Sequence, residues 1–347
     1  MPIFDKFFKD IGIDLGTATT LVYLKNRGIV LNEPTVAAVN NKTNQILAIG
    51  EEAKKMLGRT PAHITVIRPL VGGVISDFEM TREFLGALLR RQRTNPLLSY
   101  RRAVLAIPNN LTEVERKSVE DAALNAGCSR VYLVEAPIAA ALGADLPISE
   151  PTASLVLDVG GGTTDIAVIS LGGTVVSKTL KIAGDKFNDD IIRFVRDEFR
   201  LAIGEPTAEF AKIAAGSAVP IDERLEVLIR GRDFTTGLPK EVPVKNSQIR
   251  QAIQKSLQAI TESLREVIEL TPPELVGDIL KRGVFICGGG ALLRGLDKLI
   301  EKEAAISARI IDEPLTCVAR GLGRIVDDFS SHTEFLNNPL KPLPINL

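Results

Sequence analysis

Two short stretches of the chain combine aspartate, glycine and threonine in the same order. Residues 14–20 read DLGTATT and residues 158–164 read DVGGGTT, so the stretches align without a gap at an offset of 144 residues. Glycines in a tight turn expose backbone N–H groups that bind phosphate oxygens, and threonine hydroxyls add further donors. The aspartates could hold a hydrated Mg²⁺ that neutralises phosphate charge. The pattern therefore indicates a polyphosphate site.

Each stretch can also be interpreted as an ordinary β-hairpin turn, because glycine and threonine are common in such turns. For one turn the two interpretations are evenly matched. Two matching copies, nearly half the chain apart, favour a ligand site between two similar domains. Neither copy matches the GxxxxGK[ST] phosphate loop, and neither opens a helix as the dinucleotide-binding GxGxxG motif does.

A third glycine cluster, at residues 288–290, follows a predicted strand and precedes a helix that we expect to begin near Leu293. Backbone without side chains lets a flat group approach closely, so adenine could pack there. The cluster is weak evidence alone. Together with the two turns it would complete a nucleotide site.

The elements that must position these residues belong to a mixed α/β protein. Thr112 and Glu115 form a capping box for a helix that stops at Gly127, and Ser247 can cap a longer helix that ends before Pro272. Strands that first form hairpins and then alternate with helices are typical of α/β domains. With 347 residues, we expect two or more domains. Apolar runs bounded by Gly and Asn predict strands at residues 11–15, 20–24, 28–31, 103–107, 131–134, 154–159, 165–170, 174–180 and 283–287.

Composition excludes some classes of protein. The 42 Lys and Arg balance 43 Asp and Glu, which argues against a generally basic nucleic-acid binder. Three separated cysteines without a CxxC pair, and only two histidines, make structural zinc and a disulfide framework unexpected. The first ten residues are too short and too acidic for a signal peptide, and no apolar stretch is long enough to span a bilayer. We expect an intracellular, cytoplasmic chain.

The three glycine motifs carry a family resemblance. DLGTATT, DVGGGTTD and ICGGGALLRG, in this order and spacing, resemble the phosphate-1, phosphate-2 and adenosine motifs of the actin, sugar-kinase and seventy-kilodalton chaperone superfamily. GIVLNEPTVAAV, LTEVERKSVEDAALNAG and EPLTCVARGLGR resemble the MreB family of bacterial actins, and the likeness runs from about Ile11 to Gly323. A chaperone would need a substrate-binding extension that this length does not provide.

The resemblance implies the actin-like α/β fold, in which two similar domains, each with a smaller subdomain, surround a nucleotide cleft. The implied subdomains are IA (1–32, 70–148 and 322–347), IB (33–69), IIA (149–183 and 250–321) and IIB (184–249).

The resemblance also implies a site for ATP, or another purine nucleotide, with Mg²⁺. Asp14 and Asp158 would lie near the metal, holding it through water. Three residues would meet the phosphates from one side and three from the other: Thr17, Ala18, Thr19, and Gly161, Gly162, Thr163. The segment that lines ribose and base would be Glu209, Phe210, Ala211 and Lys212, and the stretch along the adenosine Gly289, Gly290, Ala291 and Leu292.

One departure from the family bears on hydrolysis. Residues 134–137 read VEAP where the family usually has I-E-E-P, so Ala136 replaces a glutamate that positions the attacking water together with a threonine matching Thr163. A methyl group can neither orient nor deprotonate water, which predicts weak hydrolysis. The alternative is that Glu135 or another carboxylate substitutes, although neighbours on an extended segment point to opposite faces.

Two stretches are candidates for membrane contact. Ile3, Phe4, Phe7 and Phe8 would form one face of a short amphipathic helix, which suits a membrane interface. Leu97 and Leu98 lie between Glu83 and Glu113, an interval with five arginines and no acid, which favours anionic lipid. The alternatives are docking of the N-terminal turn on the protein itself and a solvated basic face.

The resemblance implies an ATP-dependent filament of self-associated copies beneath the bacterial inner membrane, which guides cell-wall synthesis and rod shape with membrane-bound wall-synthesis proteins as partners. A metabolic kinase of the same superfamily would need a sugar pocket, and the sequence shows no signature of one. A nucleotide-binding adaptor that neither polymerises nor hydrolyses stays open because of Ala136. No nucleic-acid partner is expected.

Overall fold

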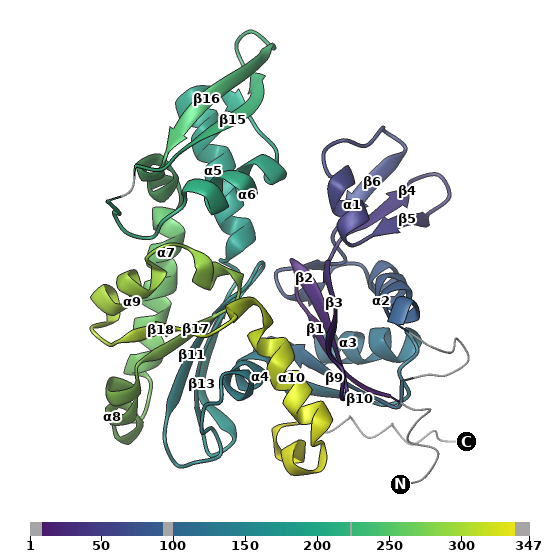
Figure 1. The fold of residues 1–347 in the computed structure, drawn as a ribbon, viewed down its shortest axis with the longest axis vertical. Coiled ribbons are helices and arrows are strands. Elements are labelled where there is room, and N and C mark those ends of the chain that lie inside the picture. Colours follow the sequence, from purple (N-terminus) through teal and green to yellow (C-terminus); the bar gives the residue numbers. More distant parts are fainter. Residues whose placement is uncertain (1–8, 93–99, 223, 337–347) are drawn as a thin grey trace.

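The computed structural model describes residues 9–92, 100–222 and 224–336, which form two halves built on separate five-stranded sheets (Figure 1). The first sheet has the order β10-β9-β1-β2-β3 and the second β13-β12-β11-β17-β18. The strands of the first are β1 (Asp10–Leu15), β2 (Thr19–Leu24), β3 (Gly28–Pro34), β9 (Arg102–Ile107) and β10 (Val131–Glu135). Those of the second are β11 (Ser154–Val159), β12 (Thr164–Ser170), β13 (Gly173–Leu180), β17 (Val284–Cys287) and β18 (Ala308–Ile310).

The two sheets repeat one arrangement. In the first half β1 is antiparallel to β2 and parallel to β9. In the second half β11 is antiparallel to β12 and parallel to β17. The sequence repeat is therefore a repeat of topology, and it places each Asp–Gly–Thr turn at the same corner of its sheet. All nine predicted strands are present, with bounds shifted by at most a few residues.

Two helices pack between the halves (Figure 1). These are α4 (Ala136–Gly143) and α10 (Cys317–Asp327), which share one apolar cluster with residues of β9, β10, β11 and β12. The helices approach very closely, because a Cβ at Gly321 would lie 1.7 Å from the carbonyl oxygen of Ala139. Tight contact through small residues joins the two halves beneath the turns.

Each half carries a smaller unit (Figure 1). On the first half it contains β4 (Ala37–Asn40), β5 (Gln45–Ile49), β6 (Ile64–Ile67) and α1 (Glu51–Met56). On the second half it contains α5 (Gly184–Phe199), β14 (Leu201–Ala202), α6 (Glu205–Ala215), β15 (Glu226–Asp233) and β16 (Pro239–Lys245). A short hairpin, β7 (Leu70–Val71) and β8 (Val74–Ile75), follows the first small unit. The predicted fold class, two α/β domains each with a smaller subdomain, is confirmed.

The remaining helices are α2 (Phe78–Gln92), α3 (Glu113–Asn125), α7 (Asn246–Glu269), α8 (Pro273–Arg282) and α9 (Leu296–Ala304). The capping box of α3 is present, since Thr112 Oγ1 accepts from the Glu115 N–H and the Glu115 carboxylate accepts from the Thr112 N–H. Two predicted helix starts were wrong. Helix α7 begins at Asn246, where the Gln248 side chain caps the Lys245 N–H, so Ser247 lies inside the helix.

The helix expected near Leu293 begins at Leu296 instead, because a 3₁₀ turn over Gly289–Leu292 comes first. Across the described ranges, no helix combines the length and apolar character needed to cross a membrane.

Candidate nucleotide-binding site

The two turns have the same local structure. Asp14 lies near the end of β1, and the Gly16 N–H closes the turn on the Thr19 carbonyl at 3.1 Å. Asp158 lies near the end of β11, and the Gly160 N–H closes its turn on the Thr163 carbonyl at 2.9 Å. Each hairpin therefore presents an aspartate beside a short run of small residues.

The turns meet each other across the boundary between the halves. A Cβ added to Gly161 would lie 2.5 Å from the Ala18 Cβ, and one added to Gly162 would lie 2.5 Å from Thr17 Oγ1. A real side chain at either position would clash at these distances, so the turns can approach this closely only because both residues are glycine. The structure thus brings Thr17, Ala18, Gly161 and Gly162 together, as predicted from the repeat.

A third segment completes the junction. The Gly73 N–H, which follows β7, donates to Thr17 Oγ1 at 3.0 Å. A Cβ at Gly73 would lie 2.9 Å from the Thr163 methyl carbon and 3.0 Å from the Pro108 ring. The β7–β8 hairpin therefore touches both turns, and no sequence motif indicated this contact.

Three carboxyl groups lie behind the turns. Burial raises the pKa of Asp14 to about 7, and burial followed by the charges of Asp165 and Asp14 raises the pKa of Asp158 to about 7. Burial also raises the pKa of Asp165, against hydrogen bonds from the Thr179 and Thr163 hydroxyls and the Asn109 N–H. A cation would favour the ionised forms of these acids.

These carboxylates fit a cation only if other groups complete its coordination. Within residues 9–92, 100–222 and 224–336, no three His, Cys, Asp or Glu side chains gather closely enough to hold a metal ion. Mg²⁺ keeps several waters and takes phosphate oxygens as ligands, so two nearby aspartates are a suitable partial set.

The predicted adenosine segments lie in the second half. Lys212 Nζ donates to the Glu209 carboxylate at 2.7 Å and to the Gly184 carbonyl at 2.9 Å, and the Asn188 amide also donates to Glu209. These bonds fix the side chains of Glu209 and Lys212 on α6. Phe210 is 55% exposed, whereas the side chains of Ala211 and Ala291 are fully buried in the core, so only their backbones could face a ligand.

The third glycine cluster packs directly on the second turn. Gly288 has φ +79°, and a Cβ there would lie 2.4 Å from Asp158 Oδ1. A Cβ at Gly290 would lie 2.2 Å from a methyl carbon of Val159. The structure therefore places the 3₁₀ turn Gly289–Leu292 next to β11, which ends at Val159. The side chain of Leu292 is 57% exposed.

Glu135 points elsewhere. Its carboxylate accepts a hydrogen bond from Thr174 Oγ1 at 2.6 Å. Thr174 pairs with Ile169 on β12. Ile169 lies five residues from Thr164, which follows the second turn, so the two Cα atoms are roughly 17 Å apart at the usual rise of a strand. The expectation that Glu135 could substitute for the missing glutamate is corrected by this placement. Ala136, partly buried, opens α4.

Sequence reasoning missed one contact between the two small units. Arg68, between β6 and β7, forms an ion pair with Glu205, the first residue of α6. Burial raises the pKa of nearby Asp185, and the charge of Arg68 opposes that rise. Partners 137 residues apart leave no local signal in the sequence.

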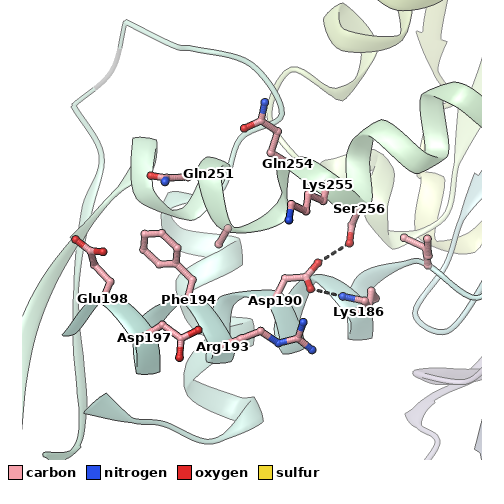
Figure 2. A pocket seen from close by; sticks show the side chains of 12 residues that line it. Lys186, Asp190, Arg193, Phe194, Asp197, Glu198, Gln251, Gln254, Lys255 and Ser256 are labelled. Carbon is pink, nitrogen blue, oxygen red and sulfur yellow. Dashed lines mark hydrogen bonds and ion pairs between the residues drawn. The ribbon is translucent and has the colours of Figure 1, made fainter. Parts of the chain in front are cut away.

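A hollow of about 630 Å³ lies away from the turns, between α5 and α7 (Figure 2). Its lining contains none of the predicted site residues. Asp190 forms an ion pair with Lys186 and accepts a hydrogen bond from the Ser256 hydroxyl (Figure 2). These charges already satisfy one another, and we assign the hollow no role.

The protein family described as MreB/Mbl protein matches residues 8–334. The chain belongs to the MreB/Mbl family.

Curated relatives agree with this membership. The cell shape-determining protein Mbl of Bacillus subtilis (strain 168) is 45% identical over 322 residues, which cover 93% of this chain and 97% of Mbl. The cell shape-determining protein MreB of Escherichia coli (strain K12) is 44% identical over 331 residues, covering 94% and 95% of the two chains.

Among solved structures, MreB5 of Spiroplasma citri bound to ADP has a TM-score of 0.89 and 38% identity, covering 94% of this chain and 97% of that one. The resemblance to MreB and the actin-like fold are therefore confirmed. The predicted membrane residues of this MreB/Mbl family member, Ile3, Phe4, Phe7, Phe8, Leu97 and Leu98, lie outside the described residues.

Proposed function

We propose that the chain binds ATP with Mg²⁺ between its two domains, assembles with further copies into filaments, and organises cell-wall synthesis at the inner face of a bacterial membrane. The observation that carries this proposal is the meeting of two equivalent turns, one from each domain, at Thr17 and Gly162. The relatives named above are cell shape-determining proteins, and MreB5 of Spiroplasma citri has been crystallised with ADP and with AMPPNP.

In this proposal each turn supplies N–H and hydroxyl donors to the phosphates, from Thr17, Ala18 and Thr19 on one side and from Gly161, Gly162 and Thr163 on the other. Asp14 and Asp158 hold Mg²⁺ through water, and the metal neutralises phosphate charge. Ribose and base lie along α6 and the third glycine cluster: Glu209, Phe210, Ala211, Lys212, Gly289, Gly290, Ala291 and Leu292. The four subdomains have the boundaries given above, although β3, α7 and α10 each continue across one of them.

Electron microscopy of the purified protein tests the assembly. We expect filaments with ATP and Mg²⁺ and none after both are removed. The second candidate, an adaptor that binds nucleotide without polymerising or hydrolysing it, is favoured by Ala136. Tight nucleotide binding with no filaments at any protein concentration would support the adaptor and contradict the filament.

The replacement Ala136→Glu should raise the rate of phosphate release. A carboxylate at the first residue of α4 can orient water and accept its proton, which contributes about 10²-fold or more in favourable geometry. We expect at least about a tenfold increase at saturating Mg–ATP, with unchanged affinity for AMPPNP. A wild-type rate that the added glutamate does not raise would show that Ala136 does not limit hydrolysis.

Deletion of residues 1–9 together with Leu97→Ser and Leu98→Ser should abolish co-sedimentation with anionic liposomes, because both apolar contacts are lost. The five arginines near Leu97 and Leu98 should contribute only modestly to binding of the anionic liposomes. Asp10 pairs with Arg101 and Arg102, and Glu33 Oε1 lies 3.7 Å from Arg91 Nη1. Two acids distant in sequence therefore pair with three of the five arginines and offset two of their positive charges. Leu228→Ser with Leu238→Ser, two exposed leucines elsewhere, is the control and should bind normally. Retained binding by the deletion variant would contradict both membrane sites.

A further inference from the structure

The segment after β9 contains a buried amide without a partner. Neither Nδ2 nor Oδ1 of Asn109 is accessible to solvent, and neither has a hydrogen bond within the described part of the chain. Leaving both ends of an amide unpaired in the interior is unfavourable. Such a group in a native protein calls for a specific reason, such as a bound water or a catalytic role.

Asn109 is held against the second phosphate turn. Its backbone N–H donates to the Asp165 carboxylate, which also accepts from the Thr163 hydroxyl and, at 2.5 Å, from the Thr179 hydroxyl. Pro108, which precedes Asn109, and Thr163 both pack against Gly73. A Cβ at Gly73 would lie 3.0 Å from the Pro108 ring and 2.9 Å from the Thr163 methyl carbon. Asn109 belongs to the first domain and Asp165 to the second, so this network ties the segment to the turn across the domain boundary.

The first turn lies at the same end of the same sheet. Asp14 pairs with Ala106 on β9, three residues before Asn109. The carboxyl ends of parallel strands meet at one edge, so Asn109 follows β9 at the edge where Asp14 precedes its turn. A terminal phosphate held between the two turns would therefore lie near this segment.

We propose that the Asn109 amide orients the water that attacks the terminal phosphate. This inference rests on the proposed ATP binding and on the weak hydrolysis expected from the sequence. The amide Oδ1 can accept a proton of the water and Nδ2 can donate to a phosphate oxygen, and a side-chain amide orients water in other nucleotide hydrolases. Two other residues are candidates for positioning the water because of their place in the VEAP segment. Ala136 has only a methyl group, and the carboxylate of Glu135 accepts a hydrogen bond from Thr174.

In this step the water oxygen forms a bond to the terminal phosphorus as the bond from that phosphorus to the bridging oxygen of ADP breaks. An amide is not a base at neutral pH, so the proton of the water passes to the released phosphate. Asn109 therefore positions the water without taking its proton, which fits slow hydrolysis and leaves room for acceleration by a carboxylate at residue 136.

The variant Asn109→Leu tests the proposal, because leucine has nearly the same shape and no polar atoms. At saturating Mg–ATP we expect phosphate release to fall about 10²-fold, the usual effect of losing the position of a reacting group. The affinity for AMPPNP should stay unchanged. The melting temperature should stay the same or rise, because an unpaired buried amide has been removed.

Asn110→Leu, at the exposed neighbouring position, is the matched control and should release phosphate at the wild-type rate. If the leucine variant does not fold, Asn109→Ala serves for the same measurements. A purely structural amide would give a lower melting temperature and an unchanged rate per folded molecule, and that result would overturn the role of Asn109. A wild type that binds ATP but releases no phosphate would overturn the proposed hydrolysis together with it.

Discussion

Replacing Gly162 by valine is expected to abolish nucleotide binding while the chain stays folded. A Cβ at this position would lie 2.5 Å from Thr17 Oγ1 and 2.8 Å from the Thr17 Cβ and Cγ2. The clash lies between the two domains, so it should prevent the turns from closing on one ligand. The hydrophobic core of each domain keeps all its side chains, so the variant should fold. We expect the affinity for Mg–ATP to fall at least about 10²-fold, which corresponds to roughly 2.7 kcal/mol.

Isothermal titration calorimetry with Mg–ATP measures this loss, and circular dichroism checks that the variant is folded. Gly173→Val is the matched control, since a Cβ at Gly173 would have no heavy atom within 4 Å. The control should bind Mg–ATP like the wild type. Wild-type affinity in Gly162→Val would refute a phosphate site formed by the two turns.

The double replacement Asp14→Asn and Asp158→Asn should remove a large pH dependence of stability. Each pKa is raised from 3.8 to about 7 in the folded protein. Between about pH 4 and pH 7 the folded state keeps protons that the unfolded chain has lost. The free energy of unfolding of the ligand-free protein therefore falls as the pH rises through this window and levels off above it. Each shift corresponds to roughly 4 kcal/mol.

Denaturant unfolding without nucleotide at pH 5, 7 and 8.5 measures this effect. The double variant should be more stable than the wild type at pH 8.5, and its free energy of unfolding should depend less on pH in this window, with Asp165 and Asp185 supplying part of the dependence that is left. The exposed acid Asp189, replaced by Asn, is the control and should keep the wild-type pH profile. Equal slopes for the wild type and the double variant would contradict the raised pKa values.

The same carboxylates should make nucleotide binding depend on pH in the opposite direction. Mg²⁺ needs ionised oxygen ligands, so the affinity of the wild type for Mg–ATP should rise as the pH passes through about 7. The double variant should bind Mg–ATP weakly at every pH. Affinity that does not change with pH in the wild type would argue against a metal held near these two acids.

Several of the strands that were predicted from the sequence, including β11 and β12, share one physical property. β11 and β12 are buried on both faces of the central sheet, so they form continuous apolar runs. β15 was missed because its buried residues Val227 and Ile229 alternate with exposed Glu226, Leu228 and Arg230, and the second part of the strand is charged. β15 and β16 of the second small unit each have one face in solvent, and runs of apolar residues do not identify such strands.

The two Asp–Gly–Thr turns could be predicted from the sequence, because a hairpin with its aspartate, glycines and threonines is a local structure and its repetition is visible in the chain. How the two turns and their surroundings combine depends on packing between distant segments. This packing places Asp10 beside Arg101 and Arg102, turns Glu135 toward Thr174, and holds Asn109 on Asp165. Each of these contacts joins residues between 39 and 92 positions apart in sequence that are brought together by packing of separate elements. Local patterns carry no record of such pairs, since their energy arises only when distant segments share one buried environment.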